Sequence, residues 1–213
     1  MPVKSKVATA RPVRGCSYTT FSSGDSSFIR EAVMPLAKEL DGHFQSEGIP
    51  LHRKVLPGPL KMARHPTNEP FVVVGIVGLL LFVGSRFTGK ILDDIYAVKI
   101  QPLVYKALGR TDKKLTGANH RKKKALQFGV WHTKHRVLIL FAIVGDSFDE
   151  ILKQQNHLRP LHANGIAWIV ENGVQKPIHV YRIEKGQGNV SPILFDSLME
   201  AQKYLRTGSH PGR

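Results

Sequence analysis

The pattern of apolar and polar positions is dominated by one uninterrupted apolar stretch from Phe71 to Gly84, with the sequence FVVVGIVGLLLFVG. The stretch has no charged or hydrogen-bonding side chain, although the whole chain carries a formal net charge of +15. As a helix it would span about 21 Å, which is shorter than the ~30 Å hydrocarbon core of a bilayer. The segment that a membrane could accept continues to Gly89, however, with Arg86 as its only charge. The choice is therefore between a membrane helix and a deeply buried core element.

Three glycines within this stretch, Gly75, Gly78 and Gly84, favour the membrane helix. Glycine weakens an ordinary helix and fits a buried strand poorly, whereas it is common where transmembrane helices pack closely. Pro70 suits the first turn of a helix, where its missing N–H is not needed. We therefore expect a transmembrane helix over residues 70–89, and the buried core element remains the alternative. The side chains expected to insert are Phe71, Val72, Val73, Val74, Ile76, Val77, Leu79, Leu80, Leu81, Phe82 and Val83.

The segment after the apolar stretch carries an amphipathic pattern and then a run of basic residues. Apolar positions recur at three-to-four spacing over residues 90–110, which predicts a basic amphipathic helix suited to an anionic headgroup layer. A basic linker over residues 111–126 contains Arg121, Lys122, Lys123 and Lys124. We expect these four cations to bind anionic lipid, and nucleic-acid phosphates are the alternative partner. Their position favours a single-pass protein with its C-terminal side in the cytoplasm, and a re-entrant or surface-lying segment with both flanks inside is the competing layout.

The N-terminal third has weaker patterns. Gly15 to Ser27 is rich in glycine, serine and threonine, which predicts a loop ahead of a helix. Apolar residues from Phe28 to Phe44 then recur with helical spacing, although Pro35 indicates either a kink or a helix that begins nearer Met34. Five prolines follow within residues 49–70, so we expect an extended linker that includes one short strand from Leu51 to Leu56.

The C-terminal third carries clearer signals. Gln127 to Thr133 and Arg136 to Val144 read as two strands, and the short link between them predicts a hairpin. Capping boxes formed by Ser147 with Glu150, and by Ser197 with Glu200, predict the starts of two helices. Two further strands are expected over 165–170 and 177–183. The predicted order β-β-α-β-β-α gives a small antiparallel sheet with helices on one face.

Overall charge and the cysteine count limit the classes of function. The chain has 31 lysines and arginines against 16 acidic residues, which favours polyanionic partners. Its single cysteine, Cys16, excludes an intramolecular disulfide and a zinc site built from several thiolates. None of its ten histidines has the spacing of a metalloprotease motif. We therefore expect neither a metal nor another cofactor.

One short motif suggests chemistry. Val144-Gly145-Asp146-Ser147-Phe148 resembles the first block of the GDS-type serine hydrolases, and the resemblance implies that Ser147 attacks an ester. It covers about eight residues, and the downstream Asp-x-x-His pair of that family does not follow Ser147. The capping role of Ser147 is favoured over the role of a nucleophile.

Taken together, these patterns predict an α+β protein with a single membrane-inserted helix and a small C-terminal antiparallel sheet. The expected function is that of a membrane-attached, non-enzymatic binding or regulatory protein whose basic domain faces anionic lipid. A soluble nucleic-acid-binding protein, with the apolar stretch as buried core, is the second hypothesis, and a protein partner stays open. The expected segments are a disordered basic tail (1–14), an N-terminal helical region (15–48), a proline-rich linker (49–69), the transmembrane helix (70–89), the amphipathic helix (90–110), the basic linker (111–126), the α+β domain (127–206) and a tail (207–213).

Overall fold

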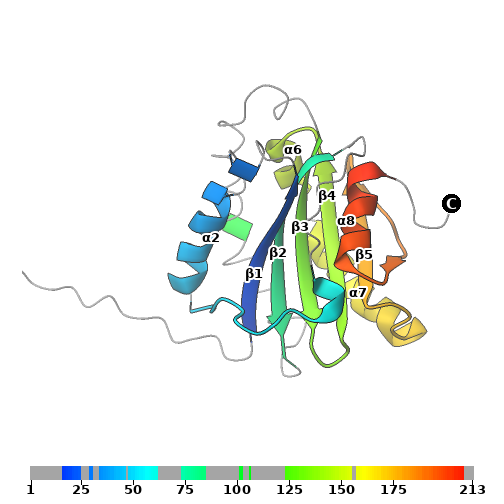
Figure 1. The fold of residues 1–213 in the computed structure, drawn as a ribbon. Coiled ribbons are helices and arrows are strands. Elements are labelled where there is room, and N and C mark those ends of the chain that lie inside the picture. Colours follow the sequence, from blue (N-terminus) through cyan, green and yellow to red (C-terminus); the bar gives the residue numbers. More distant parts are fainter. Residues whose placement is uncertain are drawn as a thin grey trace, which may run out of the picture.

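A computed structural model describes residues 16–24, 29–30, 34–46, 48–61, 73–84, 101–102, 106, 123–154 and 157–208. These residues form one seven-stranded mixed sheet with helices packed on both of its faces (Figure 1). The expected basic tail 1–14, and most of the segments 90–110 and 111–126, lie outside the described residues.

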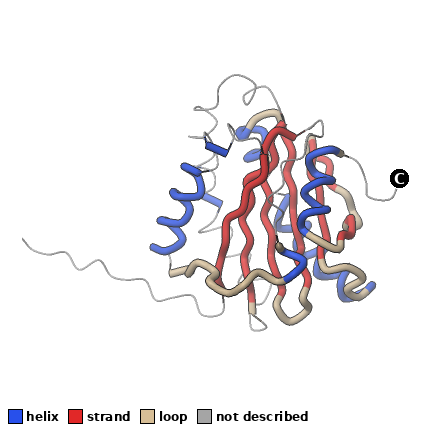
Figure 2. Tube along the Cα trace, viewed as in Figure 1, coloured by secondary structure: helices blue, strands red, loops and turns tan. Residues whose placement is uncertain are grey.

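The sheet is assembled from distant parts of the chain, and Figure 2 shows its strands side by side. β1 pairs antiparallel with β2, β2 parallel with β3, β3 antiparallel with β4, and β4 parallel with β5. Two short strands, β6 and β7, both pair antiparallel with β5. The strands are β1 (Cys16–Gly24), β2 (Val73–Val83), β3 (Lys123–His132), β4 (Val137–Gly145), β5 (Ile178–Glu184), β6 (Gln187–Gly188) and β7 (Ile193–Phe195).

The apolar stretch forms strand β2, so the expected transmembrane helix is wrong. Leu79, Leu81 and Val83 are buried in the core on one face of the sheet, whereas Leu80 and Phe82 are buried on the other. A strand covered on both faces needs apolar side chains in both directions, which produces the same uninterrupted run as a membrane segment. Within the described part of the chain, no helix is long and apolar enough to cross a bilayer.

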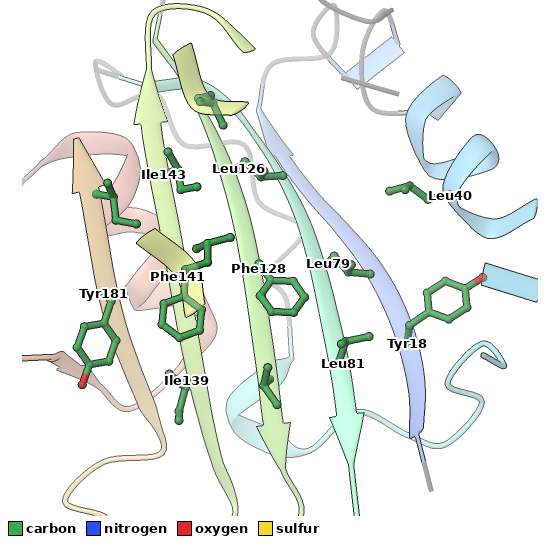
Figure 3. Close-up of a cluster of buried hydrophobic side chains, with 14 of the residues drawn as sticks. Tyr18, Leu40, Leu79, Leu81, Leu126, Phe128, Ile139, Phe141, Ile143 and Tyr181 are labelled. Carbon is green, nitrogen blue, oxygen red and sulfur yellow. The ribbon is translucent and has the colours of Figure 1, made fainter. Parts of the chain in front are cut away.

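Among the described residues, three helices cover one face of the sheet, and Figure 3 shows part of the core between the sheet and these helices. Phe128 of β3, Phe141 of β4 and Tyr181 of β5 are buried in this core, with the rings of Phe141 and Tyr181 stacked at a centroid distance of 5.8 Å. Leu40 and Phe44 bring the N-terminal helix against the same core. The helices on this face are α2 (Met34–Ser46), α6 (Phe148–Lys153) and α7 (Leu158–Asn172).

The opposite face is covered by α8 (Leu198–Thr207) and by the one-turn 3-10 helix η2 (Gly58–Leu60). In Figure 1 both lie in front of the sheet, with η2 carried by the extended chain that crosses the lower ends of the strands. Leu198 and Leu205 of α8 and Leu60 of η2 are fully buried in this second core. The sheet is therefore the middle of three layers, which corrects the expected small antiparallel sheet with helices on one face.

Local predictions in the C-terminal third are partly confirmed. The two strands joined by a short turn are present as β3 and β4. Residues 165–170, in contrast, are not a strand but lie within α7. Pro160 lies in the first turn of α7, where proline is tolerated. A Cβ on Gly165 would lie 3.1 Å from Ile139 and 3.2 Å from Tyr181, so the bare glycine lets this helix approach the sheet closely.

Both predicted capping boxes are confirmed at their serines. The Glu150 amide donates to Ser147 Oγ at 3.1 Å, and the Glu200 amide donates to Ser197 Oγ at 3.2 Å. The Glu150 carboxylate accepts a further hydrogen bond, at 2.9 Å, from the amide of Asp146, the residue before the cap. The hydroxyl of Ser147 therefore satisfies an otherwise unpaired amide at the start of α6.

We expect Ser147→Ala to lower the free energy of unfolding by about 1 kcal/mol, because it leaves that amide without its acceptor. Urea denaturation followed by circular dichroism measures this loss. The exposed Ser191 provides the control, since Ser191→Ala should stay within about 0.5 kcal/mol of the wild type. Equal stability of the two variants would show that the cap contributes nothing.

Candidate functional site

A pocket of about 980 Å³ lies at the end of the sheet where β1 begins and where β2 and β3 end. Strands β2 and β3 run parallel, so their carboxyl ends open into the same place, as at many ligand sites of parallel sheets. Residues 48–57 form one wall of the pocket. This wall comes from the segment that the sequence pattern predicts to be a proline-rich linker.

Backbone hydrogen bonds hold this wall against the outer edge of β1. The Tyr18 amide donates to the Pro50 carbonyl at 3.1 Å, and the His52 amide donates to the Tyr18 carbonyl at 2.6 Å. Leu51 thus forms a single parallel bridge with Tyr18, in place of the short strand expected over 51–56. The expected loop over 15–27 is likewise replaced by β1 from Cys16 to Gly24, because its backbone pairs with β2.

Two polar side chains meet inside the pocket. Ser17 Oγ and His52 Nδ1 share a hydrogen bond of 2.9 Å. The imidazole of His52 also stacks on the ring of Phe82, with centroids 3.7 Å apart and planes 12° from parallel. Burial, together with the positive charge of Lys54, lowers the pKa of His52, so the neutral imidazole is favoured in the pocket. Its position is therefore set by a hydrogen bond, a ring contact and the backbone.

This arrangement fits a binding pocket better than a nucleophilic active site. A serine next to a neutral imidazole supplies two groups of a catalytic triad, but among the lining residues that the structure describes none is acidic. Cys16 also lines the pocket, where burial raises the pKa of its thiol to about 11. The thiol therefore stays protonated at neutral pH, which removes its nucleophilic form.

Positive charge gathers around the pocket mouth. Arg53 and Lys54 line it and are exposed. Thr133 also lines it, and its amide donates to the Val83 carbonyl at 3.2 Å. The exposed Lys134 and Arg136 follow directly in the turn between β3 and β4. We name Arg53, Lys54, Lys134 and Arg136 the basic end of the sheet.

The residues predicted to face an anionic surface lie elsewhere. Lys123 and Lys124 are in β3, where Lys123 forms an ion pair with Glu184 and the buried Lys124 donates to the Asp146 carbonyl at 2.8 Å. Arg121 and Lys122 lie outside the described residues, so their contact with lipid or nucleic acid stays a prediction. Of the side chains expected to insert into a membrane, Phe71 and Val72 also lie outside, and the others belong to β2.

Histidines also meet on the face covered by α7. His132 at the end of β3 stacks against His162 of α7, with ring centroids 5.8 Å apart. Burial and the neighbouring histidines His162 and His135 lower the pKa of His132 to about 4. Across the described ranges, no cluster of three or more histidine, cysteine or acidic residues is placed to hold a metal ion.

The pocket was not predicted from the sequence, because its parts carry no local motif. Ser17 lies in a hydroxyl-rich segment, His52 in a proline-rich one, and Phe82 in the apolar stretch. The cluster Arg53-Lys54 beside a histidine was the only local signal, and such pairs are common in a basic chain. No protein-family model, curated protein or solved structure matches this chain.

Proposed function

We propose that the protein binds single-stranded nucleic acid at the basic end of the sheet. The observation that carries this proposal is the combination of basic and aromatic side chains around one pocket. Arg53 and Lys54 lie at its mouth, and three rings line its interior: the half-buried His52 and, in the wall, the nearly fully buried Phe82 and Trp131. Proteins that bind single strands combine these same two elements, with cations along the backbone and rings against the bases.

Charge supports a polyanionic ligand. Each lysine or arginine that contacts a phosphate releases counterions from the nucleic acid, which gives affinity that falls as salt rises. No acidic residue interrupts residues 50–57 or the turn 133–136, and the whole chain carries a net charge of +15. A long-range field of this sign steers anions toward the pocket mouth.

Aromatic rings favour a nucleic acid over anionic lipid as the source of the negative charge. Lipid headgroups would meet the same four cations, but they have no flat ring to place against the accessible imidazole of His52. Bases have two such faces, and each stacked base contributes about 1–3 kcal/mol of binding free energy. The nucleic-acid hypothesis also expects the apolar stretch to be buried core, and the side chains from Leu79 to Val83 are buried there.

Binding of a fluorescently labelled oligothymidylate, followed by anisotropy over a range of salt concentrations, tests the proposal. We expect Arg53→Gln/Lys54→Gln to weaken binding roughly tenfold and to reduce the salt slope by about 1.4, or 0.7 for each lost phosphate contact. The matched control is Lys153→Gln/Lys185→Gln. It removes the same charge from exposed positions in α6 and beside the β5–β6 turn, and it should bind within twofold of the wild type.

Two results would contradict the proposal. Equal losses in the two double variants would show that the strand senses only net charge and not the basic end. Binding to vesicles that contain phosphatidylserine, without any binding to the oligonucleotide, would assign the cations to a lipid surface instead.

A further inference from the structure

We infer that the pocket at the basic end holds one nucleotide unit, with its base inside and its phosphate at the mouth. The inference rests on the proposed function and names the part of the ligand that the pocket recognises. The volume of about 980 Å³ is at the upper end of the range for pockets that enclose a small organic ligand. By volume, the pocket is large enough for a nucleotide unit.

The interior provides a flat platform for a base. His52 and Phe82 already lie nearly parallel at 3.7 Å, so the two rings form a rigid aromatic layer beside the pocket. His52 is half-buried and lines the pocket, which leaves part of its imidazole accessible to a ligand. Trp131, from the end of β3, also lines the pocket but is only 4% exposed, so His52 presents the accessible ring. Stacking on such rings is tolerant of base identity.

The polar groups inside the pocket suit the edge of a base or a sugar hydroxyl. His52 Nδ1 is occupied by Ser17, so Nε2 is the ring nitrogen that can pair with a ligand. The hydroxyl of Ser17 can both donate and accept, and it therefore adapts to either tautomer of the imidazole. Hydrogen bonds to these two side chains would set the orientation of the base, and the aromatic layer would provide its stacking contact.

The phosphate position follows from chain order. Arg53 and Lys54 come directly after His52 on the same wall and are exposed at the mouth. A base packed against His52 therefore has its phosphate within reach of two cations from adjacent residues. An internal nucleotide is linked to the strand on both sides, so the pocket mouth would have to accommodate two phosphates. A free nucleotide or a strand end needs room for only one.

Competition experiments with the full-length protein test this inference. We expect thymidine 5′-monophosphate to displace the labelled oligothymidylate, and thymidine or inorganic phosphate alone to compete at least about tenfold less well, because each provides only half of the contacts. A linear oligothymidylate that binds more tightly than a circular one assigns the pocket to strand ends. Equal binding of the two, with displacement by the monophosphate, would show that the pocket accepts an internal nucleotide and would overturn the restriction to strand ends and free nucleotides. Displacement of neither oligonucleotide, with direct binding of the monophosphate, assigns the pocket to the free nucleotide.

Side-chain variants separate the pocket from the basic end. Ser17→Ala and His52→Ala should each weaken monophosphate binding at least about fivefold, because they remove one polar partner or the exposed part of the platform. Ser191→Ala and His157→Gln, at exposed positions, should bind as the wild type does. Thermal unfolding of each variant excludes loss of the fold as the cause.

The outcomes for the inference and for the proposed function are distinct. If the oligonucleotide binds through Arg53 and Lys54 but the monophosphate neither displaces it nor binds directly, the inference is wrong and the proposed function stands. If neither the oligonucleotide nor the monophosphate binds, both the inference and the proposed function are wrong. Monophosphate binding that is unchanged in the Ser17 and His52 variants would overturn the assignment of this pocket.

Discussion

Gly78→Val is expected to lower the free energy of unfolding by about 3 kcal/mol or more, among the largest effects of any single substitution in β2. Gly78 lies directly opposite Phe21 in the β1–β2 ladder. A Cβ atom at this position would lie 2.0 Å from Phe21 Cζ and 2.2 Å from Cε1, because the ring lies across the bare glycine. The overlap is relieved only if the Phe21 ring leaves its place across the glycine or the strand pairing shifts.

The double variant Phe21→Ala/Gly78→Val tests that cause. Removing the ring should recover much of the loss, with a coupling free energy of at least about 2 kcal/mol in a cycle measured by urea denaturation. Gly42 is the matched control, since a Cβ added to this residue of α2 would meet no atom within 4 Å. Gly42→Ala should raise stability by about 0.5–1 kcal/mol, because alanine is the better helix former. Wild-type stability of Gly78→Val would contradict this packing.

Gly78 also explains why the sequence pattern misled. Glycine within an apolar stretch indicated helix packing in a bilayer, whereas here it makes room for an aromatic side chain from the neighbouring strand. That neighbour, Phe21, is 57 positions earlier in the chain, in a segment that reads as a loop. Local hydrophobicity is the same whether lipid or protein surrounds a segment. The two cases differ only in the residues that pack against the segment, and these residues are too distant in the sequence to enter a local pattern.

Predictions succeeded where the deciding interaction is short in sequence. The β3–β4 hairpin and the two serine caps each depend on residues within a few positions of one another, and all three are present. They failed where distant contacts decide, as in α7, whose residues 165–170 have the β-branched and aromatic content of a strand. There, close packing of Gly165 against Ile139 and Tyr181 accompanies the helical conformation.

The candidate site could not be predicted for the same reason. Its lining combines Ser17 from β1, His52 from the proline-rich segment, Phe82 from β2 and Trp131 from β3. No two of these residues are close enough in sequence to form a motif. The sequence does indicate the sign of the electrostatic field around the protein, because an excess of lysine and arginine is a property of composition alone.

Acid is expected to destabilise the fold through His132. Its pKa is about 4 in the folded protein and about 6.5 in an unfolded chain, so the unfolded state binds the extra proton first as pH falls. Stability is therefore retained above pH 6.5 and decreases as the pH drops toward 4. The loss from this one side chain reaches roughly 2–3 kcal/mol by pH 4.5 and approaches roughly 3–4 kcal/mol at lower pH.

The physical cause is the position of the imidazole between β3 and α7. Protonation would place a cation in a largely buried site that faces His162 and lies near His135, and neither histidine offers a negative charge. Urea denaturation at pH 7.5 and pH 4.5 measures the effect. His132→Gln should lose roughly 2–3 kcal/mol less than the wild type between these two pH values, and His157→Gln, at an exposed position, should follow the wild type. Identical acid losses in the wild type and His132→Gln would show that another buried group, such as His179, sets the acid limit of the fold, since burial lowers its pKa as well.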